Sequence, residues 1–182
     1  MSTQTATPTG TWNIDPSHSN VTFSVKHLGI STVRGVFTDF EGTLELGEDL
    51  ESSRGHGTVD VASVDTKDQG RDEHLRSADF FDAESHPKLT FESTDIKSVR
   101  DDELEITGDL TIHGVTKPVS FKAEITGTEQ DPWGNDRVGL EVTGKIDRSD
   151  YGMKFNQALG SGNVMVSDQV KLSLDISAVK AA

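Results

Sequence analysis

The chain has 182 residues, enough for a single domain, and no stretch of it resembles a linker long enough to separate two. Its 31 acidic residues outnumber 17 basic ones and give a formal net charge of −14, which repels nucleic-acid phosphates and anionic membrane surfaces. We therefore expect no nucleic-acid partner and no stable membrane insertion, and the absence of cysteine excludes disulfides and thiolate chemistry.

Residues 1–10 are polar and carry neither the basic stretch nor the apolar stretch of a secretory signal. We expect this segment to be a disordered lead-in, followed by one domain over residues 11–182. No segment approaches the roughly 20 apolar residues that a membrane span requires. On these grounds we expect a cytoplasmic protein.

The first third of the domain shows the alternation of half-buried strands. A short strand over residues 11–14 is followed by a turn, after which Val21, Phe23 and Val25 alternate with polar residues and put His27 on the same face. Further along, Phe37 and Phe40 differ in parity, which predicts a bulge or bend near residues 38–39. Glycines within the same run favour strong curvature and hence a closed sheet.

Val59 and Val61 then lead a strand towards a charged segment in which the alternation stops. Leu75 and Ala78 lie three residues apart, which predicts a short helix near residues 70–78 with one inward stripe. Two aromatics, Phe80 and Phe81, follow it. In extended backbone such neighbours point in opposite directions, so we take only Phe81 to reach the interior.

The rest of the chain returns to strand patterning. Residues 104–112 alternate, residues 113–118 are expected to form a turn, and residues 119–125 return with strict alternation. An exposed loop is expected over residues 127–135, and two further alternating runs end near residue 176. About eight long strands at hairpin spacing favour an up-and-down barrel, although spacing alone also fits a sandwich.

Four motifs resemble those of the YceI-like family of lipocalin-like bacterial proteins. They are Arg71-Asp72-Glu73-His74-Leu75-Arg76-Ser77-Ala78-Asp79-Phe80-Phe81, His18-Ser19-Asn20-Val21-Thr22-Phe23-Ser24-Val25-Lys26-His27, Gly108-Asp109-Leu110-Thr111-Ile112-His113-Gly114-Val115-Thr116-Lys117-Pro118-Val119 and Arg148-Ser149-Asp150-Tyr151-Gly152-Met153. The resemblance covers nearly the whole chain from residue 10. It implies an all-β fold, a lipocalin-like antiparallel barrel whose interior holds a polyisoprenoid or other long-chain lipid.

The inward residues are largely Val, Leu, Ile, Thr and Gly, so we expect spare volume lined with hydrocarbon. Such a tube selects extended apolar chains, because the burial of each methylene is worth roughly 0.8 kcal/mol. We expect a bound isoprenoid quinone or polyprenyl lipid and no required cofactor. The expected ligand-binding residues are Phe23, Val25, His27, Phe37, Phe40, Val59, Val61, Arg71, Phe81, Phe91, Leu110, Ile112, Phe121, Leu140 and Arg148, of which His27, Arg71 and Arg148 are head-group candidates.

Polar residues admit other interpretations. Arg71 either binds a ligand anion or locks the short helix together with Asp72. No local HxH or HxxxH pair occurs among the six histidines, so we expect no metal site, although ligands from distant strands stay open. No GxSxG motif surrounds any serine. The alternative function is that of an enzyme acting on a lipid or a small carbonyl or ester. A third possible function is that of an interaction module whose barrel interior is filled by side chains. The sequence also leaves open whether the protein forms a homodimer.

Overall fold

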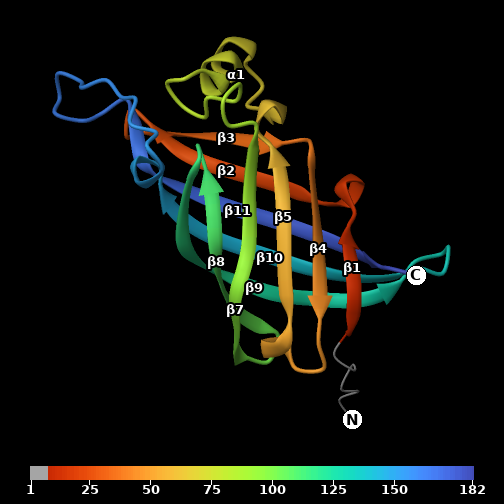
Figure 1. Cartoon of the computed structure of the whole chain (residues 1–182). Coiled ribbons are helices and arrows are strands. Elements are labelled where there is room, and N and C mark those ends of the chain that lie inside the picture. The colour runs from red at the N-terminus through yellow and green to blue at the C-terminus, as the bar shows by residue number, and fades with distance from the viewer. Residues whose placement is uncertain (1–7) are drawn as a thin grey trace.

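The computed structural model describes residues 8–182, an antiparallel β-barrel with one α-helix over one end (Figure 1). The expected lead-in over residues 1–10 lies mostly outside the described residues, and the first strand begins at its last residue, Gly10. No helix in the described part of the chain is long and apolar enough to cross a membrane.

The barrel consists of eight strands in chain order, three of which are interrupted. Short interruptions divide the first strand into β1 and β2, the second into β3 and β4, and the third into β5 and β6. The uninterrupted strands follow as a meander. The strand bounds are β1 Gly10–Ile14, β2 Asn20–His27, β3 Ser31–Phe37, β4 Phe40–Leu46, β5 Arg54–Asp60, β6 Val64–Asp65, β7 Lys88–Arg100, β8 Glu103–Ile112, β9 Val115–Gln130, β10 Asp136–Asp147 and β11 Val166–Lys180.

The last strand closes the barrel by pairing with both halves of the first. Leu172 of β11 lies opposite Phe23 of β2, and nearer the C-terminus Val179 lies opposite Asn13 of β1. The strand bends between these halves at the 3₁₀ turn η1 (Pro16–His18). Closure removes the unpaired edges that an open sheet would expose. The predicted up-and-down barrel with one short helix is therefore confirmed.

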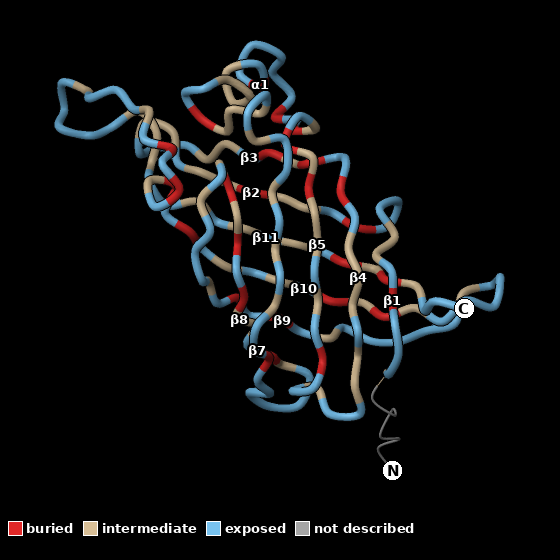
Figure 2. Tube along the Cα trace, viewed as in Figure 1, coloured by how far each residue is buried: buried red, intermediate tan, exposed pale blue. Residues whose placement is uncertain are grey.

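Buried and exposed positions alternate along the long strands, as a hollow or filled barrel requires (Figure 2). The expected bend at residues 38–39 separates β3 from β4 and leaves both Phe37 and Phe40 buried. The turn after β8 is shorter than the expected span of residues 113–118. His113 and Gly114, with φ angles of 55° and 73°, form a two-residue hairpin turn, so β9 begins at Val115.

The helix α1 (Gln69–Arg76) is attached to the end of β6 by its own charged residues. The Asp68 carboxylate caps it by accepting the backbone N–H of Arg71 at 2.9 Å. The Asp72 carboxylate accepts the backbone N–H of Thr66 at 2.8 Å, and the Arg71 guanidinium donates to the hydroxyl and carbonyl of Thr66 at 2.8 and 2.7 Å. These contacts hold the helix over the end of the barrel.

Beside the seam between β1 and β11, Arg137 of β10 bridges two carboxylates. Its guanidinium contacts Asp15, between β1 and η1, and Asp131, in the β9–β10 loop, at 2.9 Å each. Hydrogen bonds from Ser17, Arg137 and His18 hold the pKa of Asp15 well below its usual range. Burial opposes ionisation of Asp131, but donors from Asn135, Arg137 and Trp133 outweigh it and lower its pKa to about 2.

This network makes the free energy of unfolding depend on pH. Both pKa values lie below the value of about 3.9 for an unfolded Asp, so the stabilisation is present above about pH 4 and is lost as the pH falls towards 2. We expect Arg137→Gln to lower the free energy of unfolding at pH 6 and to differ much less from wild type near pH 2.5, as measured by urea denaturation. An equal difference at both pH values would contradict this.

Candidate ligand-binding site

Two cavities lie end to end inside the barrel. The far cavity, of about 200 Å³, extends towards the end opposite α1, and the cap cavity, of about 400 Å³, lies beneath α1. Five residues line both cavities and mark where the two spaces adjoin: Phe23, Phe37, Leu89, Ile112 and Leu172. Together the cavities reach the size of small-molecule binding sites, roughly 300–1,000 Å³.

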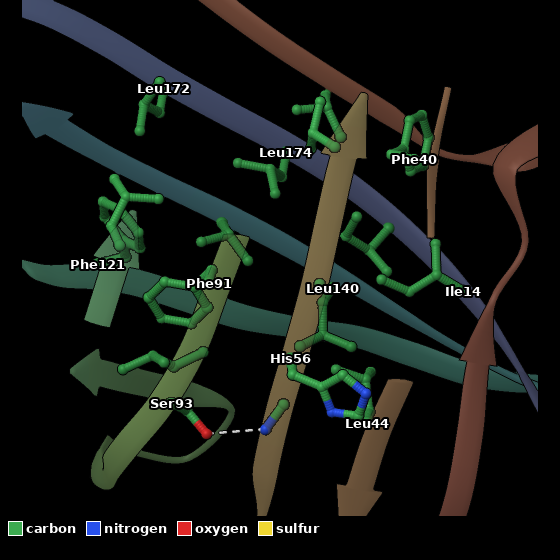
Figure 3. A pocket seen from close by; sticks show the side chains of 18 of the residues that line it. Ile14, Phe40, Leu44, His56, Phe91, Ser93, Phe121, Leu140, Leu172 and Leu174 are labelled. Atoms are coloured by element: carbon green, nitrogen blue, oxygen red, sulfur yellow. Dashed lines mark hydrogen bonds between the residues drawn. The ribbon is translucent and has the colours of Figure 1, made fainter. Parts of the chain in front are cut away.

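The far cavity is lined almost entirely by hydrocarbon. Phe91, Phe121 and Leu140 lie around it on three different strands (Figure 3). Ser93, one of the polar residues that line it, accepts the backbone N–H of Gly55 at 2.8 Å, so its hydroxyl already has a partner in the wall. A wall of this kind favours apolar ligands and offers little to hold a polar one.

Close contacts between aromatic rings and glycines keep this space open. A Cβ at Gly144 would overlap the ring of Phe121, and a Cβ at Gly35 would overlap the ring of Phe23. Each ring therefore occupies the space that a side chain would fill if the glycine in the neighbouring strand were replaced by any other residue. Because the rings lie against the wall, less of their volume projects into the interior.

The cap cavity combines an apolar floor with basic side chains. Arg71, Arg148 and His27 line it together with Lys26 and His74. The Arg71 guanidinium uses two of its nitrogens on Thr66, which confirms its role in locking the helix. Arg has five N–H donors, so this Arg retains capacity for a further acceptor.

Arg148 is 5% exposed and holds the 3₁₀ turn η4 (Arg148–Tyr151) against β11. Its guanidinium donates to the carbonyls of Ser167, Met153 and Val166 at 2.9, 2.8 and 3.2 Å. Burial lowers the pKa of this Arg, an effect that the charge of Asp168 partly offsets.

All but one of the fifteen residues expected from the sequence line a cavity. In the far cavity these are Phe23, Phe37, Phe40, Val59, Phe91, Leu110, Ile112, Phe121 and Leu140, and in the cap cavity they are Phe23, Val25, His27, Phe37, Arg71, Phe81, Ile112 and Arg148.

Val61 is the exception, and its expected placement is wrong. The strand β5 ends at Asp60, whose carboxylate accepts the backbone N–H of Ala62 at 3.1 Å, and the chain turns into the 3₁₀ helix η3 (Val61–Ser63). The alternation of β5 therefore stops before Val61, which is buried outside both cavities.

The expectation that only Phe81 of the aromatic pair faces inward is also wrong, since both Phe80 and Phe81 line the cap cavity. The chain is turned here, not extended. The backbone N–H of Phe80 donates to Ser77 and that of Phe81 donates to Leu75.

Several lining residues were not selected from the sequence. In the far cavity, Leu104 and Ile106 continue the alternation of Leu110 and Ile112 and could have been found from it, whereas Ile96 follows a register shift between Ser93 and Asp95 that changes the parity of β7. In the cap cavity, Phe155 and Met165 come from the irregular segment between η4 and β11, where no periodicity marks an inward position.

A closed antiparallel barrel of eight strands around a hydrocarbon-lined interior defines the lipocalin-like class of folds. Comparison with known proteins refines this assignment. A family model described as the YceI-like domain matches residues 12–178. The chain therefore belongs to the YceI-like family.

Relatives in this family are similar over most of their length. Protein YceI of Escherichia coli O157:H7 is 44% identical over 148 residues, which are 81% of this chain and 77% of that protein. Protein YceI of Salmonella arizonae is 41% identical over 164 residues, which are 90% of this chain and 82% of that protein.

Solved structures share the fold. The Campylobacter jejuni YceI protein has a TM-score of 0.74 at 32% identity, over 86% of this chain and 90% of that one. BcnA of Burkholderia cenocepacia has a TM-score of 0.78 at 22% identity, over 90% and 98% of the two chains. A polyisoprenoid binding domain from Saccharophagus degradans has a TM-score of 0.71 at 16% identity, over 93% and 98%.

We expect Arg148→Lys to lower the free energy of unfolding by about 2 kcal/mol, because the donors of an ammonium group share one nitrogen and cannot reach the three carbonyls that three guanidinium nitrogens contact. Arg54→Lys is the matched control. Its side chain is largely exposed and pairs with Glu45 only at 3.7 Å, so its effect should stay below about 0.5 kcal/mol. Equal losses in the two variants, measured by urea denaturation, would contradict the assignment.

Tyr151 offers a second test of the packing at this end of the barrel. Burial raises the pKa of its phenol to about 12, the charge of Asp150 acts in the same direction, and its hydroxyl makes no hydrogen bond to a described residue. We expect Tyr151→Phe to raise the free energy of unfolding by about 1 kcal/mol, since an unpaired buried hydroxyl is removed. A loss of that size would show that the hydroxyl has a partner.

Proposed function

We propose that the protein binds a long-chain isoprenoid, such as a quinone or polyprenyl lipid, and stores or carries it in the barrel interior with no cofactor required. The observation that carries this proposal is the pair of adjoining cavities. The one under α1 has cationic groups, and the one beyond it is almost purely apolar.

The far cavity suits the tail. A tail of about twenty methylenes that fills the far cavity and continues into the cap cavity gains roughly 16 kcal/mol from burial, set against the roughly 4–15 kcal/mol or more that association costs in lost freedom. A branched, extended chain that occupies both cavities passes Phe23 and Phe37, whose rings pack against each other with centroids 5.5 Å apart.

The cap cavity suits the head group. His27, Arg71 and Arg148 line it, and the side chain of each can donate a hydrogen bond to a quinone carbonyl or a phosphate. The desolvated guanidinium of Arg148 stands 5.8 Å from the ring centroid of Phe80, so its charge faces an aromatic surface at the cavity wall. This arrangement supports the orientation with the tail in the far cavity.

The cap cavity favours binding over catalysis. Of the described residues that line it, only Thr66 has a hydroxyl group, and that hydroxyl donates to the Asp72 carboxylate. The His74 imidazole stands 2.9 Å from Asp79, but nothing on the cavity wall offers it a nucleophile to activate. Membership of the YceI-like family, and the likeness to the Saccharophagus domain, point the same way.

A substitution that fills the far cavity tests the proposal. We expect Leu140→Trp to weaken binding of geranylgeraniol to the delipidated protein at least tenfold, because the indole takes up much of the 200 Å³ available to the tail. Affinity is measured by displacement of a fluorescent polyene fatty acid.

The control is Val99→Trp, at a position that is 61% exposed on the outer surface. It should bind as wild type does. Equal affinities for the two variants, or wild-type affinity for geranylgeraniol no greater than for octanol, would contradict the proposal.

A further inference from the structure

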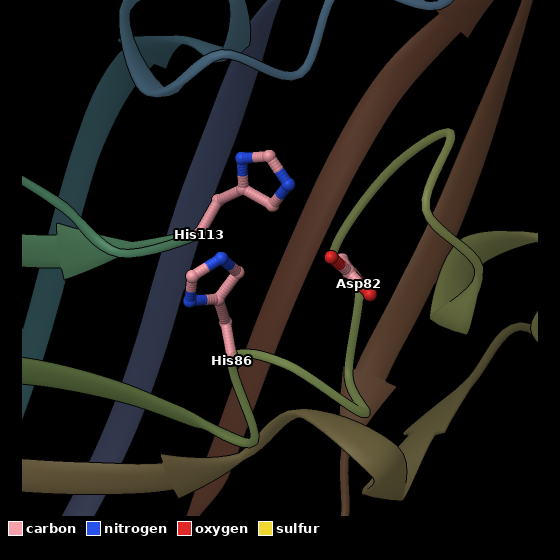
Figure 4. A group of neighbouring side chains, drawn as sticks. All are labelled: Asp82, His86 and His113. Carbon is pink, nitrogen blue, oxygen red and sulfur yellow. The ribbon is translucent and has the colours of Figure 1, made fainter.

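Outside both cavities, three side chains with metal-ligating atoms converge on one point beside the cap end of the barrel. Asp82 and His86 lie in the segment between α1 and β7, and His113 lies in the turn between β8 and β9 (Figure 4). One ligand atom from each lies within 4.8 Å of the others. All three residues are half-buried.

His113 is held in the tautomer that a metal needs. Its Nδ1 lies 3.0 Å from the backbone carbonyl of Tyr151. A carbonyl only accepts, so Nδ1 carries the proton and Nε2 keeps its lone pair free. A second-shell carbonyl that fixes the ring in this way is the usual support of a metal-binding histidine.

His86 is placed by packing. Its ring lies over Gly114 so closely that a Cβ there would stand 2.7 Å from its Cε1 atom. The ring centroids of His86 and His113 are 5.0 Å apart at an angle of 62°. Within the described part of the chain, the nitrogens of the His86 ring make no hydrogen bond, so both are available.

Asp82 supplies an anionic oxygen. Its backbone carbonyl accepts the N–H of His86 at 2.8 Å, which closes one turn and brings the two side chains to the same side of the segment. Its carboxylate makes no hydrogen bond or ion pair to any described residue. A half-buried carboxylate beside two imidazoles is a donor set typical of divalent transition metals.

We propose that Asp82, His86 and His113 bind a divalent transition-metal ion of the Zn²⁺ type, with one coordination position left to solvent or another ligand. In a tetrahedral site with bonds of 2.0–2.1 Å, ligand atoms stand about 3.4 Å apart. The three atoms lie within 4.8 Å of one another, so the Asp82 side chain, which no described hydrogen bond restrains, has to rotate towards the two imidazoles when the ion binds.

The bound ion ties the segment after α1 to the β8–β9 hairpin. Phe81 and Ile112, the chain neighbours of Asp82 and His113, both line the cap cavity. The site therefore stabilises the wall of that cavity from outside, independently of what the cavity binds. Binding to the folded state alone raises its thermal stability.

Calorimetric titration of the metal-stripped protein with Zn²⁺ tests the site. We expect one equivalent of Zn²⁺ to bind and to raise the melting temperature. In Asp82→Asn and His113→Asn, we expect the affinity for Zn²⁺ to fall at least tenfold and the rise in melting temperature to shrink. Asn is chosen because both positions have positive φ, 49° and 55°, which Asn tolerates. Circular dichroism checks that each variant is folded.

Two controls separate this site from surface binding. Glu84→Gln removes an exposed carboxylate from the same segment, and His18→Gln removes an exposed histidine far from the cluster. Both should bind Zn²⁺ as wild type does. A titration without a one-equivalent step, or cluster variants within twofold of the wild-type affinity, would overturn the proposal.

Discussion

Phe121 and Phe23 lie against glycines of the strands beside them, and the hollow interior depends on those contacts. An eight-stranded barrel is at the limit where side chains alone can fill it. With Gly144 and Gly35 accommodating the rings at the wall, aromatic residues contribute apolar surface without occupying the centre. Alternation along the closed meander then places hydrocarbon side chains at most of the other positions around the far cavity.

At the cap end, the residues that hold the structure together also give the cavity its polar character. Arg71 fastens α1 to Thr66 and Arg148 fastens η4 to β11, yet both line the cap cavity. Their charges are positioned by the fold before any ligand arrives, which lowers the cost of ordering a head-group site. This double role explains why the sequence supports both a structural and a ligand-binding interpretation of Arg71 and Arg148.

Alternation of period two predicted the long strands and the bend after Phe37, and all but one of the fifteen residues selected from the sequence line a cavity. The errors lie where that period ends: at Val61, where a carboxylate cap turns the chain, and at Phe80, where backbone hydrogen bonds replace extension. The cluster at Asp82 and His86 was missed because a search for paired histidines passes over an Asp four residues before a His. Its third member, His113, comes from another hairpin, and only the folded chain brings it near.

The account rests on an interior that holds an extended apolar molecule. Native mass spectrometry of gently purified protein, before and after extraction with organic solvent, tests it most directly. The account predicts a discrete mass above that of the bare chain, lost on extraction and recovered from the solvent as a long-chain lipid. Bare protein alone, with no such lipid in the extract, would contradict it.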